Sequence, residues 1–197
     1  MDTIAPFRIT VCGIEELEGH NAAGVSQVLS ILDPEWPVPE AFGGFGEHEK
    51  LELRFHDVIE DTETTGGPRE AHVAHLLRFG RDLMQEPSGR AHLLVHCHAG
   101  ISRSTAAMTL ILAQALPQRG AEEILAEIVR IREKAWPNLR ILELGDAMLG
   151  RGGTLVAAAP PLYRRQLERR PWLAEEMTRL GRAREIEAAK RAGYAAP

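Results

Sequence analysis

A short apolar run, a tight loop and a helix follow one another near the middle of the chain, and this succession constrains the fold more than any other feature. His92–Val95 is short and apolar, as expected of a buried strand. The loop Cys97–Arg103 contains Gly100 and small residues, which suit a sharp change of direction. After Arg103 the chain reads S-T-A-A-M-T-L-I-L-A-Q-A-L up to Pro117, which predicts a helix. A strand that feeds a helix in this way indicates an α/β fold.

Further strand-like and helix-like segments flank this unit. Phe7–Cys12 and Leu51–Phe55 alternate apolar and polar residues, and Val25–Leu32 runs to the turn signal Asp33-Pro34. Residues 33–50 and 60–67 are rich in Pro, Gly or polar residues and are expected to form loops. Three further helices are expected. One begins at Pro68 with Gly67 as N-cap, and the second covers about Ala121–Ala135. The third follows Pro137, with Asn138 as N-cap, and ends at about Gly150.

Strands that alternate with helices predict a central, mostly parallel sheet flanked by helices. We expect residues 1–150 to form this domain. Residues 151–197 are expected to form a linker, over 151–159, and a helical C-terminal extension broken at Pro171. In such folds ligands bind beyond the carboxyl ends of the strands, and the loop Cys97–Arg103 follows one of these ends.

The side chains and backbone of this loop suit a phosphate group. The N–H groups of a tight loop can converge on one point, and the start of the following helix adds its positive end. The same field favours the thiolate of Cys97, which would make it a nucleophile. Arg103 carries a planar fork of donors that matches two phosphate oxygens. Ser104 offers a hydroxyl that can stabilise the thiolate as a leaving group.

The segment His96–Thr105 reads H-C-H-A-G-I-S-R-S-T and resembles the H-C-x5-R-S/T signature of the protein-tyrosine-phosphatase superfamily. Its G-x-S-R-S part is similar to that of the small dual-specificity phosphatases and their bacterial relatives, and the resemblance covers roughly residues 7–150. It implies a phosphomonoester hydrolase that forms a phosphocysteine on Cys97, with Arg103 as phosphate clamp. It also implies substrate-binding residues His98, Ala99, Gly100, Ile101, Ser102 and Arg103, and supporting residues His96, Ser104 and Asn138.

Hydrolysis of a phosphate ester through a cysteine also needs an acid to protonate the leaving oxygen. Among Asp57, Glu60, Asp61 and Glu63, we prefer Asp57 because it directly follows a predicted strand, as the acid does in the family. Asp61 is the main alternative. The spacing of forty residues from Asp57 to Cys97 is a departure from the family, because it is somewhat longer than expected of small dual-specificity enzymes. The mechanism requires no metal and no cofactor.

The composition indicates which partners and which cellular compartment to expect. The net charge of −5 disfavours nonspecific binding to nucleic acid. The chain has only two cysteines, which is typical of a reducing compartment, and its start shows no signal-peptide pattern, so we expect a cytoplasmic protein. No run approaches the roughly 20 apolar residues that span a membrane.

Two other functions fit the motif. The first is a catalytically inactive pseudophosphatase that binds phosphorylated proteins, although Cys97, Arg103 and a candidate acid are all present. The second is a phosphatase of phosphoinositides or other small phosphate esters. Lipid-directed relatives tend to carry lysines in the loop, and its interior H-A-G-I-S has none. The expected partner is therefore a phosphorylated protein or a small phosphate ester, preferably a phosphotyrosine protein.

Overall fold

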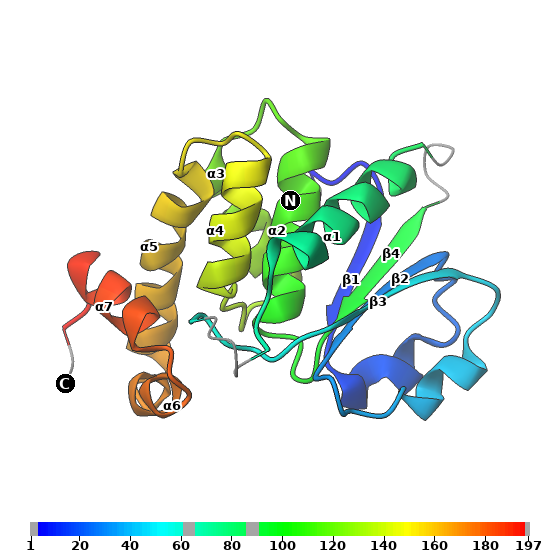
Figure 1. The fold of residues 1–197 in the computed structure, drawn as a ribbon, viewed down its shortest axis with the longest axis horizontal. Helices are drawn as coiled ribbons and strands as arrows, with labels where there is room; N and C mark the ends of the chain where they lie inside the picture. The colour runs from blue at the N-terminus through cyan, green and yellow to red at the C-terminus, as the bar shows by residue number, and fades with distance from the viewer. Residues whose placement is uncertain (1–3, 61–65, 86–90, 196–197) are drawn as a thin grey trace.

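A four-stranded parallel sheet forms the centre of the protein in the computed structural model, which describes residues 4–60, 66–85 and 91–195. The strand order is β1–β4–β2–β3, and all the pairs are parallel (Figure 1). The predicted parallel sheet flanked by helices is therefore confirmed. The strands are β1 Arg8–Cys12, β2 Gln27–Leu32, β3 Glu49–Arg54 and β4 His92–His96.

The two inner strands are buried on both faces because the sheet separates two hydrophobic cores. Leu29 of β2 and Val95 of β4 pair in register and face the main core. Val28 and Leu94, one residue earlier on each strand, also pair and face the smaller core. This alternation follows from the two-residue period of a strand, and it explains why both strands are rich in apolar residues.

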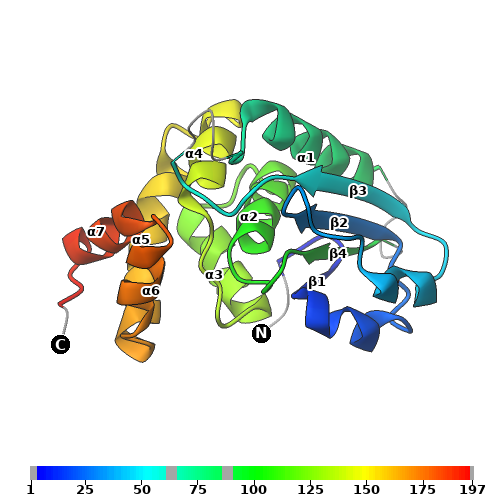
Figure 2. The same ribbon diagram turned by 60° about the horizontal axis from the view of Figure 1, so that its bottom comes forward.

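Helices cover the main-core face of the sheet, as Figures 1 and 2 show. Helices α1, α2 and α3 contact the strands, and α4 packs against α2. Leu17 and Phe42, from two 3₁₀ segments, help to form the smaller core behind the sheet. The helices are α1 Glu70–Leu83, α2 Arg103–Ala115, α3 Ala121–Ile131, α4 Leu139–Met148, α5 Thr154–Arg169, α6 Leu173–Arg179 and α7 Ala183–Arg191, and the 3₁₀ segments are η1 Ile14–His20 and η2 Glu40–Gly44.

Two of the predicted helix boundaries are wrong. Helix α1 begins at Glu70 with Arg69 as its N-cap, two residues after the predicted start at Pro68, and the N-cap amide of Arg69 donates to Nδ1 of His72 at 3.1 Å. Helix α3 ends at Ile131 instead of continuing to Ala135. The backbone becomes extended at the next residue, Arg132, with φ −135° and ψ 93°, and the Arg132 side chain reaches the loop between β4 and α2.

Helix α5 begins inside the segment predicted to be a linker. Its N-terminal amides are capped by the buried carboxylate of Asp146, which accepts from the N–H groups of Gly153 at 2.5 Å and Leu155 at 2.7 Å. A carboxylate at a helix start satisfies orphan amides and favours the helix dipole. The cap comes from α4, so no local pattern around Thr154 could reveal it.

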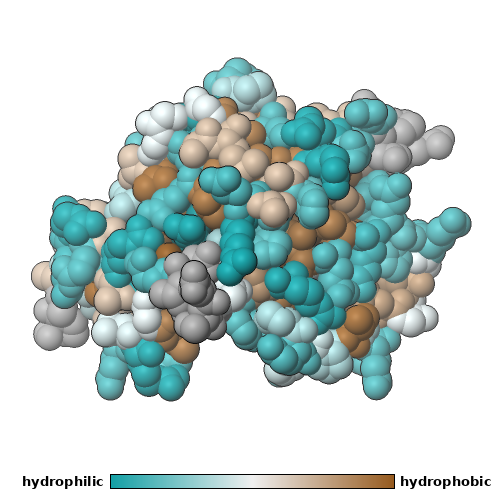
Figure 3. All heavy atoms as spheres, viewed as in Figure 1, coloured by the Kyte–Doolittle hydropathy of each residue, from teal (hydrophilic) through white to brown (hydrophobic). Residues whose placement is uncertain are grey.

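The C-terminal helices extend the main core beyond the sheet. Leu155, Tyr163 and Leu167 of α5 and Ile186 of α7 are buried in the same hydrophobic cluster as β4 and α2. Helices α5–α7 lie on the side of α4 that faces away from the sheet (Figure 1). On the face seen in Figure 3, hydrophilic residues cover most of the surface, and hydrophobic ones gather in small patches. In the described ranges, no helix has the length and apolar character needed to cross a membrane.

Candidate active site

The loop between β4 and α2 presents its carbonyl groups to the surrounding protein. The carbonyl oxygens of His98 and Ile101 accept from the backbone N–H groups of Ile14 and Trp136, both at 2.9 Å, and that of Ser102 accepts from Asn138 at 3.3 Å. By contrast, the N–H groups of residues 98–102 have no backbone acceptor in the part of the chain that the structure describes. A loop whose carbonyls are engaged and whose amides are free is arranged to bind an anion.

Arg132 and Gly100 fix the shape of this loop. Arg132 donates from Nε to the Gly100 carbonyl at 2.9 Å and from Nη2 to the Ala99 carbonyl at 3.1 Å. Its guanidinium also pairs with Glu16, and this hydrogen bond lowers the pKa of Glu16 to about 2. Gly100 has φ +66°, and a Cβ there would lie 2.3 Å from the backbone carbon of Cys12, so only glycine fits.

Cys97 lies at the end of β4 with its side chain buried at the base of the loop. Its Sγ is 3.2 Å from Oγ of Ser104, in the first turn of α2. The hydroxyl can donate to a thiolate, as expected of a group that stabilises the sulfur as nucleophile and leaving group. The second cysteine, Cys12, is buried on β1, and burial raises its pKa to about 12 with a smaller contribution from Glu16. Cys12 is therefore held as a neutral thiol.

Arg103 joins the ends of two neighbouring strands. Its Nη1 donates to Oδ1 of Asp33 and to the carbonyl of Phe55, both at 2.6 Å. Asp33 directly follows β2, and Phe55 directly follows β3. The side chain is buried, and in the described residues its Nε has no hydrogen-bond partner. A buried guanidinium with an unused donor is costly unless a ligand completes it, so Arg103 is suited to bind an oxyanion.

Asp57 lies in the segment that follows β3, beside the loop between β4 and α2, and one of its carboxylate oxygens is held by three groups. Its Oδ1 accepts from Oγ of Ser102 at 2.7 Å and from Nδ2 of Asn138 at 2.8 Å, and it forms an ion pair with Arg182 at 3.3 Å. Burial alone would raise the pKa of Asp57, but Arg182, Arg103 and these donors outweigh it and lower the pKa. Among the described residues, no group bonds to Oδ2, so this oxygen is available to carry a proton.

The two histidines that flank Cys97 have different surroundings. His96 is buried, and its Nε2 lies 2.8 Å from Oγ of Ser30 on β2. Burial lowers its pKa to about 4, so His96 is a neutral brace between strands. His98 contacts Trp36, with ring centroids 4.5 Å apart, and its Nε2 lies 3.2 Å from the backbone N of Asp33. Burial also lowers the pKa of His98, with a contribution from Arg103.

A hollow of about 440 Å³ opens beside the loop. His98 and Trp36 line it together with Lys134, and Trp36 is 46% exposed. His98, expected from the family resemblance to bind substrate, therefore lines this hollow. Glu15 and Glu16 also line the hollow, so an exposed indole and side chains of both charges are available to the part of a ligand that lies beyond the loop.

The structure brings together most of the residues singled out from the sequence. Cys97, Ser104, Arg103, Asp57 and Asn138 all surround the one loop, and Asn138 also caps α4 by accepting from Ile141 N–H at 3.0 Å. The alternative acids Asp61 and Glu63 lie outside the described residues. The remaining candidate, Glu60, is paired with Arg184 of α7 at 2.8 Å.

Sequence reasoning missed three charged residues of the site. Asp33 could have been found, because it follows a predicted strand just as Asp57 does. Arg182 and Glu185 lie about eighty residues beyond the loop, in the extension, and form a buried pair next to Ser102. Neither residue belongs to a motif, so no sequence signal connects them with Cys97.

Neither a family model nor a curated protein sequence matches the chain. Solved structures do match. Human DUSP28 is 16% identical with a TM-score of 0.55, and the match covers 77% of this chain and 99% of that chain. PTPMT1, solved in complex with PI(5)P, is 18% identical with a TM-score of 0.52, covering 73% and 91%. Human tyrosine phosphatase-like serine/threonine/tyrosine-interacting protein is 16% identical with a TM-score of 0.52, covering 72% and 87%.

These neighbours define the class of fold. The chain has the fold of the dual-specificity and protein-tyrosine phosphatases, as the H-C-x5-R-S/T motif predicted. At such low identity the likeness concerns the fold alone. The chemistry of the site, and not this likeness, indicates the reaction and the roles of individual residues.

Proposed function

We propose that this protein is a cysteine-dependent phosphomonoester hydrolase, acting on phosphotyrosine or related phosphate esters through a phosphocysteine intermediate. One observation carries the proposal. A loop with engaged carbonyls and free amides lies between a buried cysteine and a buried arginine that has an unused donor. Such a loop offers a phosphate both its hydrogen-bond donors and a nucleophile.

The first step of the proposed reaction transfers the phosphoryl group to the enzyme. The Cys97 thiolate attacks phosphorus, the bond from phosphorus to the ester oxygen breaks, and that oxygen takes a proton from Oδ2 of Asp57. Arg103 and the amides of residues 98–102 hold the equatorial oxygens. Ser102 and Asn138 keep Oδ1 of Asp57 in place, which leaves Oδ2 free for the proton.

The second step releases phosphate. Asp57, now a carboxylate, accepts a proton from water as the water oxygen attacks phosphorus. The sulfur–phosphorus bond breaks, and Ser104 donates to the thiolate that leaves. Phosphate departs, Asp57 carries a proton again and Cys97 is ready for another cycle. No redox change occurs, and every proton is accounted for by Asp57.

The experiment that tests this function measures hydrolysis of para-nitrophenyl phosphate by the purified protein with a chelator present. We expect turnover and, after rapid acid quenching, one phosphoryl group on the peptide that contains Cys97. A parent protein that binds a phosphotyrosine peptide but hydrolyses nothing would contradict the proposal and favour the pseudophosphatase. Turnover confined to phosphoinositides would instead identify a lipid phosphatase.

The clamp role of Arg103 gives a separate prediction. Arg103→Lys keeps the charge but removes the planar fork and its Nε donor. We expect kcat/KM to fall by about a hundredfold to a thousandfold, as when one preorganised donor to a transition state is lost. Steady-state kinetics with para-nitrophenyl phosphate measures the effect. Arg119→Lys is the matched control, because Arg119 is paired with Glu123 on the surface. A clamp variant with parent kinetics would exclude this role.

A further inference from the structure

The turn between α6 and α7 directs one arginine of the C-terminal extension toward the loop between β4 and α2. Gly181 has φ +74°, its N–H donates to the Thr178 carbonyl at 3.0 Å, and the N–H of Arg182 donates to the Met177 carbonyl at 2.8 Å. This pair of bonds is a Schellman motif, which ends α6 and reverses the chain. The next residue, Arg182, therefore points back into the protein instead of continuing the helix.

Arg182 reaches the residue that precedes the phosphate clamp. Its Nη1 donates to Oγ of Ser102 at 2.8 Å and lies 3.3 Å from Oδ1 of Asp57. The other guanidinium nitrogens, Nε and Nη2, donate to the two carboxylate oxygens of Glu185 at 2.8 and 2.7 Å. The side chain of Arg182 is only 2% exposed and that of Glu185 is fully buried.

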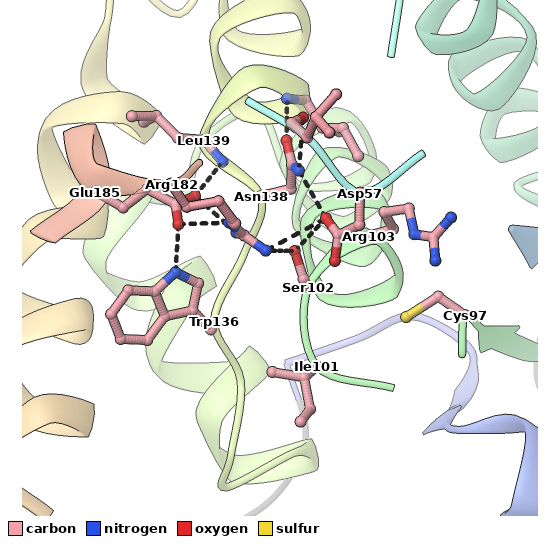
Figure 4. A network of polar contacts seen from close by, with 12 residues as sticks. Asp57, Cys97, Ile101, Ser102, Arg103, Trp136, Asn138, Leu139, Arg182 and Glu185 are labelled. Atoms are coloured by element: carbon pink, nitrogen blue, oxygen red, sulfur yellow. Dashed lines mark hydrogen bonds and ion pairs between the residues drawn. The ribbon is translucent and has the colours of Figure 1, made fainter. Parts of the chain in front are cut away.

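Glu185 connects the arginine to a second support of the loop. It accepts from Nε1 of Trp136 at 2.6 Å and from the N–H of Leu139, the first residue of α4, at 3.0 Å. The N–H of Trp136 donates in turn to the carbonyl of Ile101, inside the loop. Figure 4 shows the contacts of Arg182 and Glu185 together, and the pair reaches the loop region both through Ser102 and through Trp136.

Stability alone is a poor reason to bury this pair. Apolar residues of similar volume usually stabilise a core as well as a buried ion pair does, because charges lose their hydration on burial. What apolar residues cannot supply is a donor to Ser102 and a cation beside Asp57. Burial alone would lower the pKa of Arg182, but Glu185 and Asp57 raise it, so the guanidinium remains charged. The arrangement therefore keeps the guanidinium of Arg182 charged and directed at Ser102 and Asp57.

We propose that Arg182, held by Glu185, is a positioning residue for the phosphate-binding loop and for Asp57, so that the C-terminal extension takes part in phosphate binding and transfer. The inference rests on the function proposed above. Arg182 does not touch the reacting atoms; it acts through Ser102 and Asp57. Under this proposal, the helices after α4 contribute to phosphate binding and transfer by holding Arg182 in place.

The test compares three full-length variants with the parent. Arg182→Met with Glu185→Gln removes the donor to Ser102 without leaving an unpaired buried charge, and the amide introduced by Glu185→Gln keeps an oxygen acceptor for Trp136. Arg182→Lys restores a cation and a donor. Arg151→Met is the matched control, because Arg151 is also in the extension but binds the carbonyls of Pro117 and Arg119, away from the loop.

Two readouts separate positioning from stability. The first is kcat and KM for para-nitrophenyl phosphate, and the second is the dissociation constant of inorganic phosphate measured by calorimetry in the Cys97→Ser background. In the double variant we expect kcat/KM to fall by about tenfold to a hundredfold, as for other small misplacements of catalytic groups. Phosphate binding should also weaken, Arg182→Lys should recover part of both losses, and Arg151→Met should match the parent.

A folded double variant with the kinetics and phosphate affinity of the parent would overturn the proposal. If the parent itself has no turnover, the proposed function fails, but phosphate affinity still decides this inference: weaker binding in the double variant supports it and equal binding overturns it. If the double variant does not fold, Arg182→Lys and Ser102→Ala are combined instead. Non-additive effects on phosphate affinity would support a route through Ser102, and additive effects would overturn it.

Discussion

Replacement of Cys97 by serine is expected to abolish hydrolysis of para-nitrophenyl phosphate, with kcat falling by about a millionfold, the scale of loss when a covalent hydrolase loses its nucleophile. Serine keeps the size of the side chain and can still contact Ser104, 3.2 Å from the sulfur. It has no thiolate, however, and its hydroxyl is a far weaker nucleophile at neutral pH. The residual rate is measured with a chelator present, so that contaminating metal phosphatases do not contribute.

The same variant should retain phosphate binding. The amides of residues 98–102 and the guanidinium of Arg103 remain in place, so calorimetry should show a dissociation constant for inorganic phosphate close to that of the parent. Cys12→Ala is the matched control, since Cys12 is the only other cysteine and its neutral thiol plays no part in the reaction. If Cys97→Ser still turns over substrate, the nucleophile lies elsewhere and the proposed mechanism is wrong.

Replacement of Asp57 by asparagine is the second large effect that we expect. The amide oxygen can still accept from Ser102 and Asn138, so the loop keeps its support, but no proton can be donated. General acid catalysis contributes about a hundredfold to ten-thousandfold, and the loss should approach that range with phenyl phosphate. It should be smaller with para-nitrophenyl phosphate, whose leaving group needs a proton less. The measurement is therefore the ratio of kcat for phenyl phosphate to kcat for para-nitrophenyl phosphate, compared between the parent and Asp57→Asn.

The acid role of Asp57 also predicts how turnover changes with pH. Asp57 acts as an acid only when protonated, and Arg182 and Arg103 keep its pKa low although burial opposes them. Turnover by the parent should therefore decline as pH rises through a low pKa, with the optimum on the acidic side of neutrality. His98 is another titratable group at the site, and burial lowers its pKa, so its own charge change falls in the acidic range as well. In Asp57→Asn the decline on the alkaline side should disappear.

Asp33→Asn is the control that separates the two carboxylates. Asp33 also follows a strand and contacts Arg103 directly, at 2.6 Å, so it is the other described carboxylate placed to act as the acid. If Asp33→Asn shows the leaving-group dependence and Asp57→Asn does not, the acid is Asp33. If neither does, the role would pass to Asp61.

Local sequence patterns predicted those parts of the fold that local forces determine. The strands around Val28 and Val95 were evident because strands buried on both faces are mostly apolar. The N-cap at Asn138 was evident because its side chain bonds an amide only three residues ahead. By contrast, the start of α5 depends on Asp146 of another helix, and Arg132, just after α3, bonds the carbonyl of Gly100 far back in the chain.

The sequence by itself predicted the core of the candidate site. A strand, an H-C-x5-R-S loop and a helix can place a cysteine, an arginine and free amides around one anion because all of them lie within ten residues. Only the tertiary structure decided what surrounds that anion site. Asp33, Asp57 and Arg182 come from three distant segments, and they meet because parallel strands end at one edge of the sheet and a Schellman turn sends the extension back to the loop. Side chains that meet only when the chain folds have no fixed spacing in the sequence, so no local motif reveals them.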